Sequence, residues 1–159
     1  MKTYWLRKSI WLPQQRTQVF DFFSNPGNLD RLTPAWLNFA ILTPVTSQIK
    51  PGALLDYRLR IHGIPIGWQS EIAVWEPPHR FVDRQTKGPY SLWVHEHTFE
   101  ERDNGTLVGD NVEYAVPGGS IVQKFLVAPD LERIFNYRHK ILDELFNPAK
   151  ITRSQRTGS

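Results

Sequence analysis

Residues 91–115 read SLWVHEHTFEERDNGTLVGDNVEYA and contain the pattern that decides the fold. Two stretches that alternate between apolar and polar side chains, 91–101 and 106–115, flank the segment Arg102-Asp103-Asn104-Gly105. Alternation with a period of two is typical of a strand with one buried face, and a short Asp/Asn/Gly segment between two such strands is typical of a hairpin turn. These residues therefore predict two long antiparallel strands joined by a tight turn.

The two faces of this hairpin differ in character. On the first strand the more solvent-like face carries Val94, Glu96, Thr98 and Glu100, so the opposite face is expected to point inward; it consists of Trp93, His95, His97 and Phe99. On the second strand the even positions are the more apolar set, and we expect them to point inward as well: Thr106, Val108, Asp110, Val112 and Tyr114. Side chains on one face of a strand share an environment, so the pattern buries two imidazoles and a carboxylate together.

Two registers bring both inward faces to the same side of the sheet. One sets His97 opposite Asp110, and the other sets Phe99 opposite Asp110, which leaves His97 diagonal to that residue at about 7–8 Å. Three interpretations of the pair remain open. It can be a structural hydrogen bond, a group that recognises a polar part of a ligand, or an acid/base pair in which Asp110 orients the ring and His97 moves the proton.

The segments around the hairpin complete an α+β pattern. Before it, strands are predicted at 3–12, 39–42, 54–61, 66–75 and 80–85, and short helices at 15–24 and 28–32, the second capped by Asn28. After it, 120–127 is a first helical piece, and Pro129 is expected in the first turn of a new helix or at a kink. From Leu131 an apolar stripe follows the helical period, with Arg138 interrupting it. The sum is an antiparallel sheet with helices packed on one side.

Length and charge narrow the protein class. The chain has 159 residues, which suits one domain, and we expect residues 1–148 to form it, with 149–159 as a basic tail. The net charge of +3 resides in residues 150–159, which include three basic residues and no acidic one, so the predicted body is neutral and a nucleic-acid partner is disfavoured. We see no export signal and no stretch that would insert into a membrane, and the expected location is the cytoplasm.

Several kinds of cofactor and nucleophile are disfavoured by the residues present. There is no Cys, which excludes disulfides, thiolate catalysis and zinc–thiolate sites. His95-x-His97 is a conceivable metal pair with Asp110 as third ligand, but nothing else in the sequence supports it, and we expect no metal. No Gly-x-Ser-x-Gly and no glycine-rich phosphate loop occurs, so we expect no nucleotide cofactor either.

Aromatic residues are abundant, at 13 % of the chain. Trp and Tyr carry a polar atom that needs a partner when buried, so their number indicates either a thick aromatic core or an apolar cavity with polar tips. For the cavity we expect a lining that includes Tyr57, Trp68, Trp93, His95, His97, Asp110 and Tyr114.

Several segments resemble the START-related SRPBCC superfamily, and in particular its bacterial single-domain branch labelled polyketide cyclase/dehydrase-like. The similar segments are Val19-Phe20-Asp21-Phe22-Phe23-Ser24-Asn25-Pro26, His62-Gly63-Ile64-Pro65, Trp75-Glu76-Pro77-Pro78-His79-Arg80-Phe81-Val82-Asp83 and Leu131-Glu132-Arg133-Ile134-Phe135. The resemblance extends from Thr3 to about Phe146. It implies a helix-grip fold, in which a curved antiparallel β-sheet wraps around a long C-terminal helix and leaves a cavity between them.

Three functions follow as hypotheses. The first is binding of a small hydrophobic or aromatic molecule, such as the lipids, polyketides and sterols that the superfamily binds. The second is a cyclase or dehydratase that acts on a polyketide-like substrate through His97 and Asp110, without metal or nucleotide. The third is a non-enzymatic module that contacts a protein partner through the basic tail and any exposed aromatic rim. The sequence does not decide the oligomeric state.

Overall fold

A computed structural model describes residues 1–44 and 49–147 of the chain. Seven strands form one antiparallel sheet in the order β1-β7-β6-β5-β4-β3-β2. Their bounds are β1 (Tyr4–Leu12), β2 (Ala40–Ile41), β3 (Leu54–Ile61), β4 (Ile64–Glu76), β5 (Arg80–Lys87), β6 (Leu92–Arg102) and β7 (Gly105–Ala115). The predicted α+β class and the order of the elements are confirmed.

The hairpin at residues 91–115 forms as predicted. Its ends are Arg102 and Gly105, and the two residues between them, Asp103 and Asn104, have φ angles of 50° and 60°. A two-residue turn with positive φ at both positions matches the twist of the flanking strands. Of the two registers, the structure has the one that sets His97 opposite Asp110.

The short helices after β1 differ from the prediction. The first is α1 (Arg16–Phe23), but the expected helix at 28–32 is replaced by 3₁₀ turns, η1 (Pro26–Asn28) and η2 (Asp30–Leu32), followed by η3 (Ala35–Leu37). The capping side chain is Asn25, which accepts a hydrogen bond from the Gly27 amide at 3.0 Å, and not Asn28. Pro26 and Pro34 bias the residues before them away from the α conformation, and the short stretch between them suits 3₁₀ turns.

The C-terminal helical run contains a π-helical turn before its long segment. It consists of α2 (Gly119–Val122), the π-helical η4 (Gln123–Val127) and α3 (Ala128–Phe146). Pro129 lies in the first turn of α3, which was one of its two predicted positions. It has no N–H to donate to a carbonyl of the preceding turn, and its ring crowds that carbonyl. The wider π turn directly before it gives the ring room.

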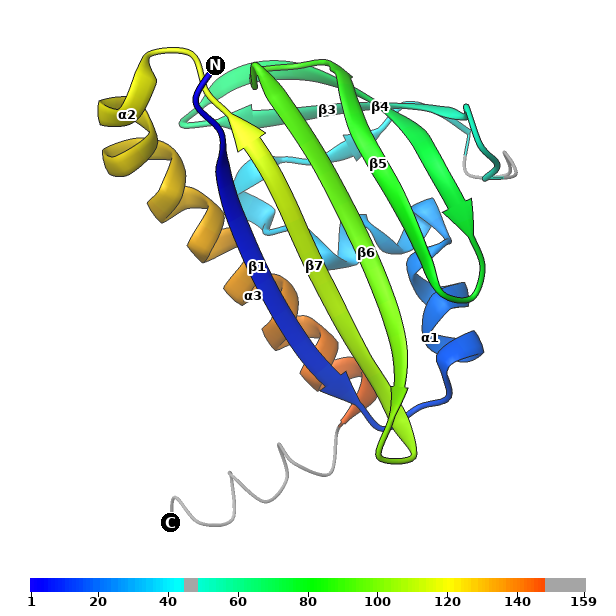
Figure 1. Cartoon of the computed structure of the whole chain (residues 1–159). Helices are drawn as coiled ribbons and strands as arrows, with labels where there is room; N and C mark the ends of the chain where they lie inside the picture. The colour runs from blue at the N-terminus through cyan, green and yellow to red at the C-terminus, as the bar shows by residue number, and fades with distance from the viewer. Residues whose placement is uncertain (45–48, 148–159) are drawn as a thin grey trace.

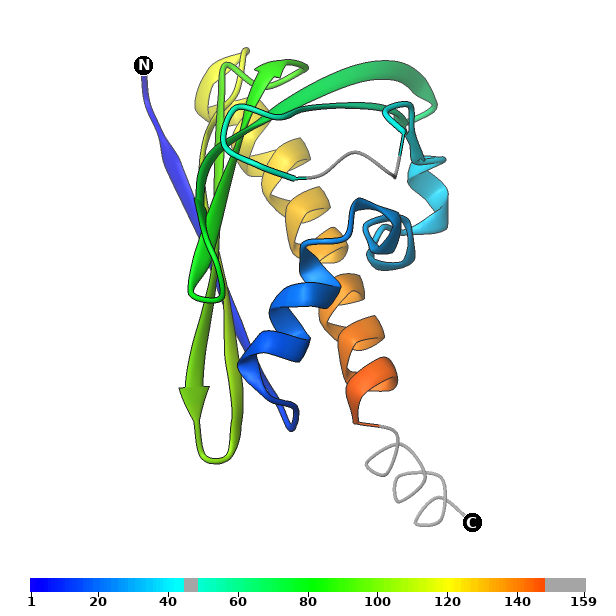
Figure 2. The same cartoon turned by 90° about the vertical axis from the view of Figure 1, so that its right-hand side faces the viewer.

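The sheet curves around α3, as Figures 1 and 2 show, and α1 with the 3₁₀ turns lies on the same side of the sheet as that helix. The pairing of β4 with β5 has register shifts at Gln69/Ser70 and at Ile72/Val74. Such irregularities bend a strand and increase its local twist. The helix-grip arrangement expected from the resemblance is confirmed.

Candidate ligand cavity and its buried polar network

A cavity of about 620 Å³ lies between the concave face of the sheet and α3. Its walls are mostly apolar and come from the inner faces of β3–β6, the 3₁₀ turns and α3. Of the seven residues that the sequence predicted to line it, five do: Tyr57, Trp68, Trp93, His95 and His97. Asp110 and Tyr114 are not among the lining residues. Asp110 is fully buried behind the histidines, and the Tyr114 hydroxyl accepts a hydrogen bond from Gln123 at 3.0 Å.

Three aromatic rings form one end of the cavity wall. Tyr90 and Trp93 have ring centroids 4.7 Å apart, and Trp68 contacts Trp93 at 5.4 Å and Tyr90 at 5.5 Å. The Trp68 indole N–H donates to the Ser70 hydroxyl at 3.0 Å, so its polar atom is paired. The aromatic abundance of the sequence is therefore used both to pack the core and to line a hollow.

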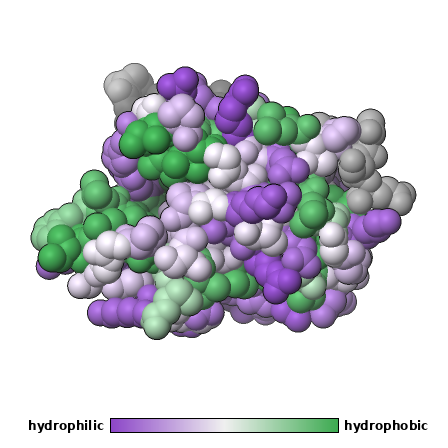
Figure 3. Space-filling model, turned by 90° about the horizontal axis from the view of Figure 1, so that it is seen from above, coloured by the Kyte–Doolittle hydropathy of each residue, from purple (hydrophilic) through white to green (hydrophobic). Residues whose placement is uncertain are grey.

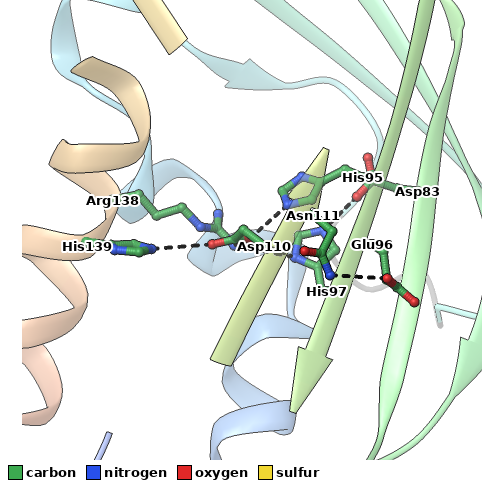
Figure 4. A network of polar contacts seen from close by, with 8 residues as sticks. All are labelled: Asp83, His95, Glu96, His97, Asp110, Asn111, Arg138 and His139. Atoms are coloured by element: carbon green, nitrogen blue, oxygen red, sulfur yellow. Dashed lines mark hydrogen bonds and ion pairs between the residues drawn. The ribbon is translucent and has the colours of Figure 1, made fainter. Parts of the chain in front are cut away.

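A buried polar network crosses the middle of the structure and joins the sheet to α3 (Figure 4). Asp110 Oδ1 accepts a hydrogen bond from His95 Nε2 at 2.8 Å and lies 3.4 Å from Arg138 Nη2. Its second oxygen, Oδ2, lies 3.6 Å from His139 Nε2. One carboxylate of β7 thus contacts two residues of β6, His95 and His97, and two residues of α3.

Asp110 remains ionised in this setting. Burial alone would raise its pKa, but the positive charge of Arg138 and the contacts with His139 and His95 outweigh burial and hold the pKa well below its ordinary value. A buried ion pair of this kind requires both partners, because either charge alone would be costly to bury.

The second histidine belongs to a separate pair. His97 Nε2 donates to Asp83 Oδ2 at 2.8 Å, while His97 Nδ1 lies 3.5 Å from Arg138 Nη2 and 3.6 Å from Asp110 Oδ1. The residue hydrogen-bonded to Asp110 is thus His95, and His97 is its neighbour. His97 also stacks on Phe81 with ring centroids 4.2 Å apart.

Burial governs the charge of the second pair. It lowers the pKa of His97 to about 4, with His95 adding to the effect, and the hydrogen bond to Asp83 opposes it only in part. Burial would raise the pKa of Asp83, but the contacts with His97 and His95 outweigh it and lower that pKa below its usual value. At neutral pH the pair is a neutral imidazole and a carboxylate.

Among the described residues, Asp83, His95 and His97 could offer ligand atoms to a metal, since one atom from each lies within 4.8 Å of the others. The tautomer of His97 is not compatible with metal coordination through its Nε2 atom. Arg138 can only donate, so the His97 Nδ1 atom facing it is an acceptor, and the proton sits on Nε2. That nitrogen donates to Asp83 and has no lone pair for a metal. The arrangement suits hydrogen bonding better than metal coordination.

Sequence reasoning missed three residues of the network, which are Asp83, Arg138 and His139. Asp83 follows the buried Phe81 by two positions and so shares its face, a signal that was available. Arg138 interrupts the apolar stripe of the sequence, yet it is 6 % exposed and occupies a core position of α3. An arginine at such a position implies a buried carboxylate partner. His139 stands beside Lys140, a pattern typical of a solvated rim, but the structure places it 3.6 Å from Asp110.

The end of the molecule beside the cavity exposes apolar side chains. His62, in the β3–β4 turn, contacts Asp130 of α3 at 2.7 Å, and both residues line the cavity. In the adjacent helical segment Ile121, Phe125 and Leu126 are exposed, and Figure 3 shows apolar surface gathered at this end.

Within the described residues no helix combines the length and the apolar character needed to cross a bilayer. The predicted basic tail, residues 149–159, lies outside the described residues.

Comparisons with known proteins agree with this fold. Residues 12–137 match the family described as polyketide cyclase / dehydrase and lipid transport. No curated protein matches the chain significantly. Protein CV1439 of Chromobacterium violaceum superposes with a TM-score of 0.71 at 14 % identity, covering 91 % of this chain and 97 % of its own. For TTHA0849 of Thermus thermophilus the values are 0.70, 16 %, 92 % and 99 %.

A third solved structure is an enzyme. The Thalictrum norcoclaurine synthase, a point mutant in complex with a transition-state analogue, superposes with a TM-score of 0.63 at 14 % identity, covering 90 % of this chain and 96 % of its own. At these identities the likeness concerns the fold. The same backbone arrangement therefore occurs in at least one protein with catalytic activity.

Proposed function

The chain belongs to the polyketide cyclase/dehydrase and lipid transport family, and from that premise we propose that it binds a small hydrophobic or aromatic molecule between its sheet and α3. The observation that carries the proposal is the cavity of about 620 Å³ with mostly apolar walls. Small-molecule sites in proteins have volumes of roughly 300–1,000 Å³ and apolar linings with a few convergent polar groups. The polar groups here include His95, His97, Asp83 and Arg138.

A neutral fluorescent probe tests this proposal. N-phenylnaphthylamine gains fluorescence when it leaves water for an apolar site, and we expect wild-type protein to bind it saturably. Ile134 of α3 lines the cavity and is half-buried, so Ile134→Trp should fill part of the space and weaken binding by about tenfold or more.

The matched control is Ile121→Trp, because Ile121 lies in the same helical run but is 72 % exposed and does not line the cavity. This variant should bind the probe as the wild type does. Absence of saturable binding to the wild type, or equal weakening in both variants, would contradict the proposal.

A second candidate function is a cyclase or dehydratase on a polyketide-like substrate. It is favoured by the pairing of buried carboxylates with imidazoles at the cavity wall. Asp110 accepts from His95 Nε2, which leaves His95 Nδ1 as a base that could take a proton from a bound substrate. His97, which the sequence predicted as the proton-transferring residue, lies beside this pair, with its Nδ1 3.6 Å from Asp110 Oδ1. In this candidate mechanism it is a neighbouring polar group.

The enzymatic candidate is tested by turnover of a poly-β-ketone substrate with His95→Ala, His97→Ala and Asp110→Asn. Acid/base groups contribute a factor of about 10²–10⁴ to a rate. The substitution that removes the proton-transferring residue should therefore reduce turnover by a factor of about 10² or more. His79→Ala is the control, since His79 is exposed and outside the cavity. Turnover within tenfold of the wild type in all three variants would eliminate an acid/base role for this network.

A further inference from the structure

We propose that ligands enter and leave the cavity between α3 and the elements that face its first half, the β3–β4 turn and η3. Two side-chain contacts cross this route and close it, one between His62 and Asp130 and one between Trp36 and Arg133. We call them the rim contacts. This inference rests on the proposed binding function and adds to it the residues that control access to the site.

Part of the cavity wall is only one side chain thick. Five of the residues that line the cavity are themselves exposed to solvent, namely Trp36, His62, Gly63, Pro117 and Arg133. A residue that faces the cavity on one side and solvent on the other has no second layer of protein packed behind it. Cavity and solvent are therefore least separated at these positions.

Two other margins of the cavity are closed by packed or buried groups. At the end of the molecule near α1, Phe22 and Phe146 of α3 have ring centroids 5.0 Å apart. Along β6 and β7, the buried pair of Asp110 and Arg138 ties α3 to the sheet. A ligand that passed at either margin would have to separate close-packed rings or a buried ion pair, and both are costly.

The rim contacts lie where the wall is thin. His62 Nε2 is 2.7 Å from Asp130 Oδ2, and more than half of the His62 side chain is exposed. One helical turn further along α3, the Arg133 guanidinium lies over the exposed Trp36 ring, 5.0 Å from its centroid. Exposed ion pairs and exposed cation–π contacts are individually weak. This margin is thus held by contacts that open readily.

The β3–β4 turn is free to move away from α3. It is a two-residue turn with φ angles of 50° at His62 and 78° at Gly63, and no atom lies within 4 Å of a β-carbon added at Gly63. Ile64, the next residue, is exposed as well. The turn reaches α3 through the His62 side chain, so opening that contact lets the turn move without breaking the core.

Contacts that close a route affect rates more than affinity. The rim contacts can form both before and after a ligand has entered, and they are open only while the ligand passes. Removing one of them should therefore raise the association and the dissociation rate constants together. Their ratio, the dissociation constant, should stay within about twofold of the wild-type value.

Stopped-flow fluorescence with N-phenylnaphthylamine measures both rate constants. We expect His62→Ala to raise each of them by about threefold and Arg133→Gln to do the same, because a weak exposed contact changes a rate by up to about fivefold. The double variant should raise each by about tenfold, because the two contacts share no residue. His62 is changed rather than Asp130, since a carboxylate in the first turn of α3 also stabilises the helix.

The matched control is Lys8→Ala. Lys8 of β1 contacts Glu132 of α3 at the same distance, 2.7 Å, and both side chains are partly exposed, but neither residue lines the cavity. The variant removes a contact of the same kind from the same part of α3, and we expect wild-type rate constants. Equal acceleration in His62→Ala and Lys8→Ala would show that the contacts act through a general loosening of α3, and would overturn the inference.

A reversible cross-link tests the route in the opposite direction. The chain has no Cys, so His62→Cys combined with Asp130→Cys introduces the only two thiols, which a short disulfide-forming cross-linker joins. Cross-linking should slow both rate constants by about tenfold or more, and a reductant should restore them. The same cross-link between positions 8 and 132 should have no effect. Unchanged rates in the protein cross-linked at the rim would overturn the inference.

The outcomes separate this inference from the proposed function. If the probe binds saturably but neither the rim variants nor the rim cross-link changes the rate constants, the inference is wrong while the binding function stands. If the rim variants weaken the affinity about tenfold at an unchanged association rate constant, these residues hold the ligand and do not control its entry, and the inference is again wrong. If the wild type does not bind the probe, the proposed function and the inference both fail.

Discussion

Asp110 connects the two layers of the fold from a position that water does not reach. Its carboxylate is fully buried and contacts His95 on the sheet and Arg138 and His139 on α3. Removing one member of a buried ion pair leaves the other charge uncompensated, which costs more than the pair itself contributes. The residue is therefore expected to matter for stability whatever role it has toward a ligand.

Asp110→Asn should lower the free energy of unfolding by about 3–5 kcal/mol, since it leaves the Arg138 guanidinium buried without a counter-charge. Urea unfolding measures the change. Glu71→Gln is the control, because the pair between Glu71 and Arg84 is on the surface and worth less than about 1 kcal/mol. Equal losses in the two variants would show that the network contributes no more than a surface pair.

His97 should make the protein sensitive to mild acid. Its pKa is lowered to about 4 by burial, so between pH 6.5 and about 4 the unfolded chain binds a proton that the folded protein does not. The stabilisation is complete above the unfolded pKa and is lost as pH falls through the folded one, by on the order of 3 kcal/mol. The lowered pKa values of Asp83 and Asp110 add a further loss below this window.

The measurement is the free energy of unfolding against pH for the wild type and for His97→Gln, which keeps a donor for Asp83 but does not titrate. We expect a shallower decline between pH 6.5 and about 4 in this variant. His79→Gln, at an exposed histidine, should follow the wild type. A decline of the same slope in all three proteins would contradict the assignment to His97.

At the same residue scale, the alternation of β6 and β7 was sufficient to predict that His95, His97 and Asp110 point inward. It could not predict which imidazole bonds to which carboxylate. That choice depends on side-chain rotamers and on Asp83, which arrives from β5. It depends also on Arg138, which is 28 positions beyond Asp110 in the sequence and comes close only when α3 packs on the sheet.

Among the elements, the β6–β7 hairpin is held in place by close backbone approach at its turn. Gly105 begins β7, and a β-carbon there would overlap the Leu12 carbonyl oxygen and the Trp11 ring. The Trp11 indole N–H donates to the Arg102 carbonyl at 2.8 Å, which fixes that ring over the turn. The turn and the end of β1 therefore fit together only without a side chain at position 105.

Gly105→Ala should lower the free energy of unfolding by about 1–3 kcal/mol, because backbone rather than a flexible side chain must move. Gly67→Ala is the control, since Gly67 lies in β4 with no atom within 4 Å of an added β-carbon. That change should be neutral or slightly stabilising. Thermal or urea unfolding compares the two, and equal effects would refute the steric argument.

The other elements could be predicted to different extents. Hydrophobic periodicity was sufficient for the seven strands and for the long helix from Leu131, because burial of one face dictates the period. The segment between Pro26 and Pro34 forms 3₁₀ turns where the sequence predicts a short helix at 28–32, since short polar stretches carry little periodic signal. The π turn at Gln123–Val127 could not be predicted, because Pro129 is the only feature of the sequence pattern that indicates an irregularity there.

On the scale of the whole molecule, the proposed binding function depends on incomplete closure between two layers. The polar network draws α3 toward β6 and β7, while β3 and β4 curve over the helix and are held by the contact between His62 and Asp130 (Figure 2). The space left between these attachments is the cavity of about 620 Å³. The aromatic abundance of the sequence was compatible with a filled core as well, so the choice between the two required the three-dimensional arrangement.

The most direct test of this account is a crystal structure of the protein with N-phenylnaphthylamine bound. The account predicts probe density between the sheet and α3, in contact with Trp93 and Leu131, which line the cavity. Density only on the exposed apolar side chains of Phe125 and Leu126, with the interior occupied by protein side chains, would contradict it.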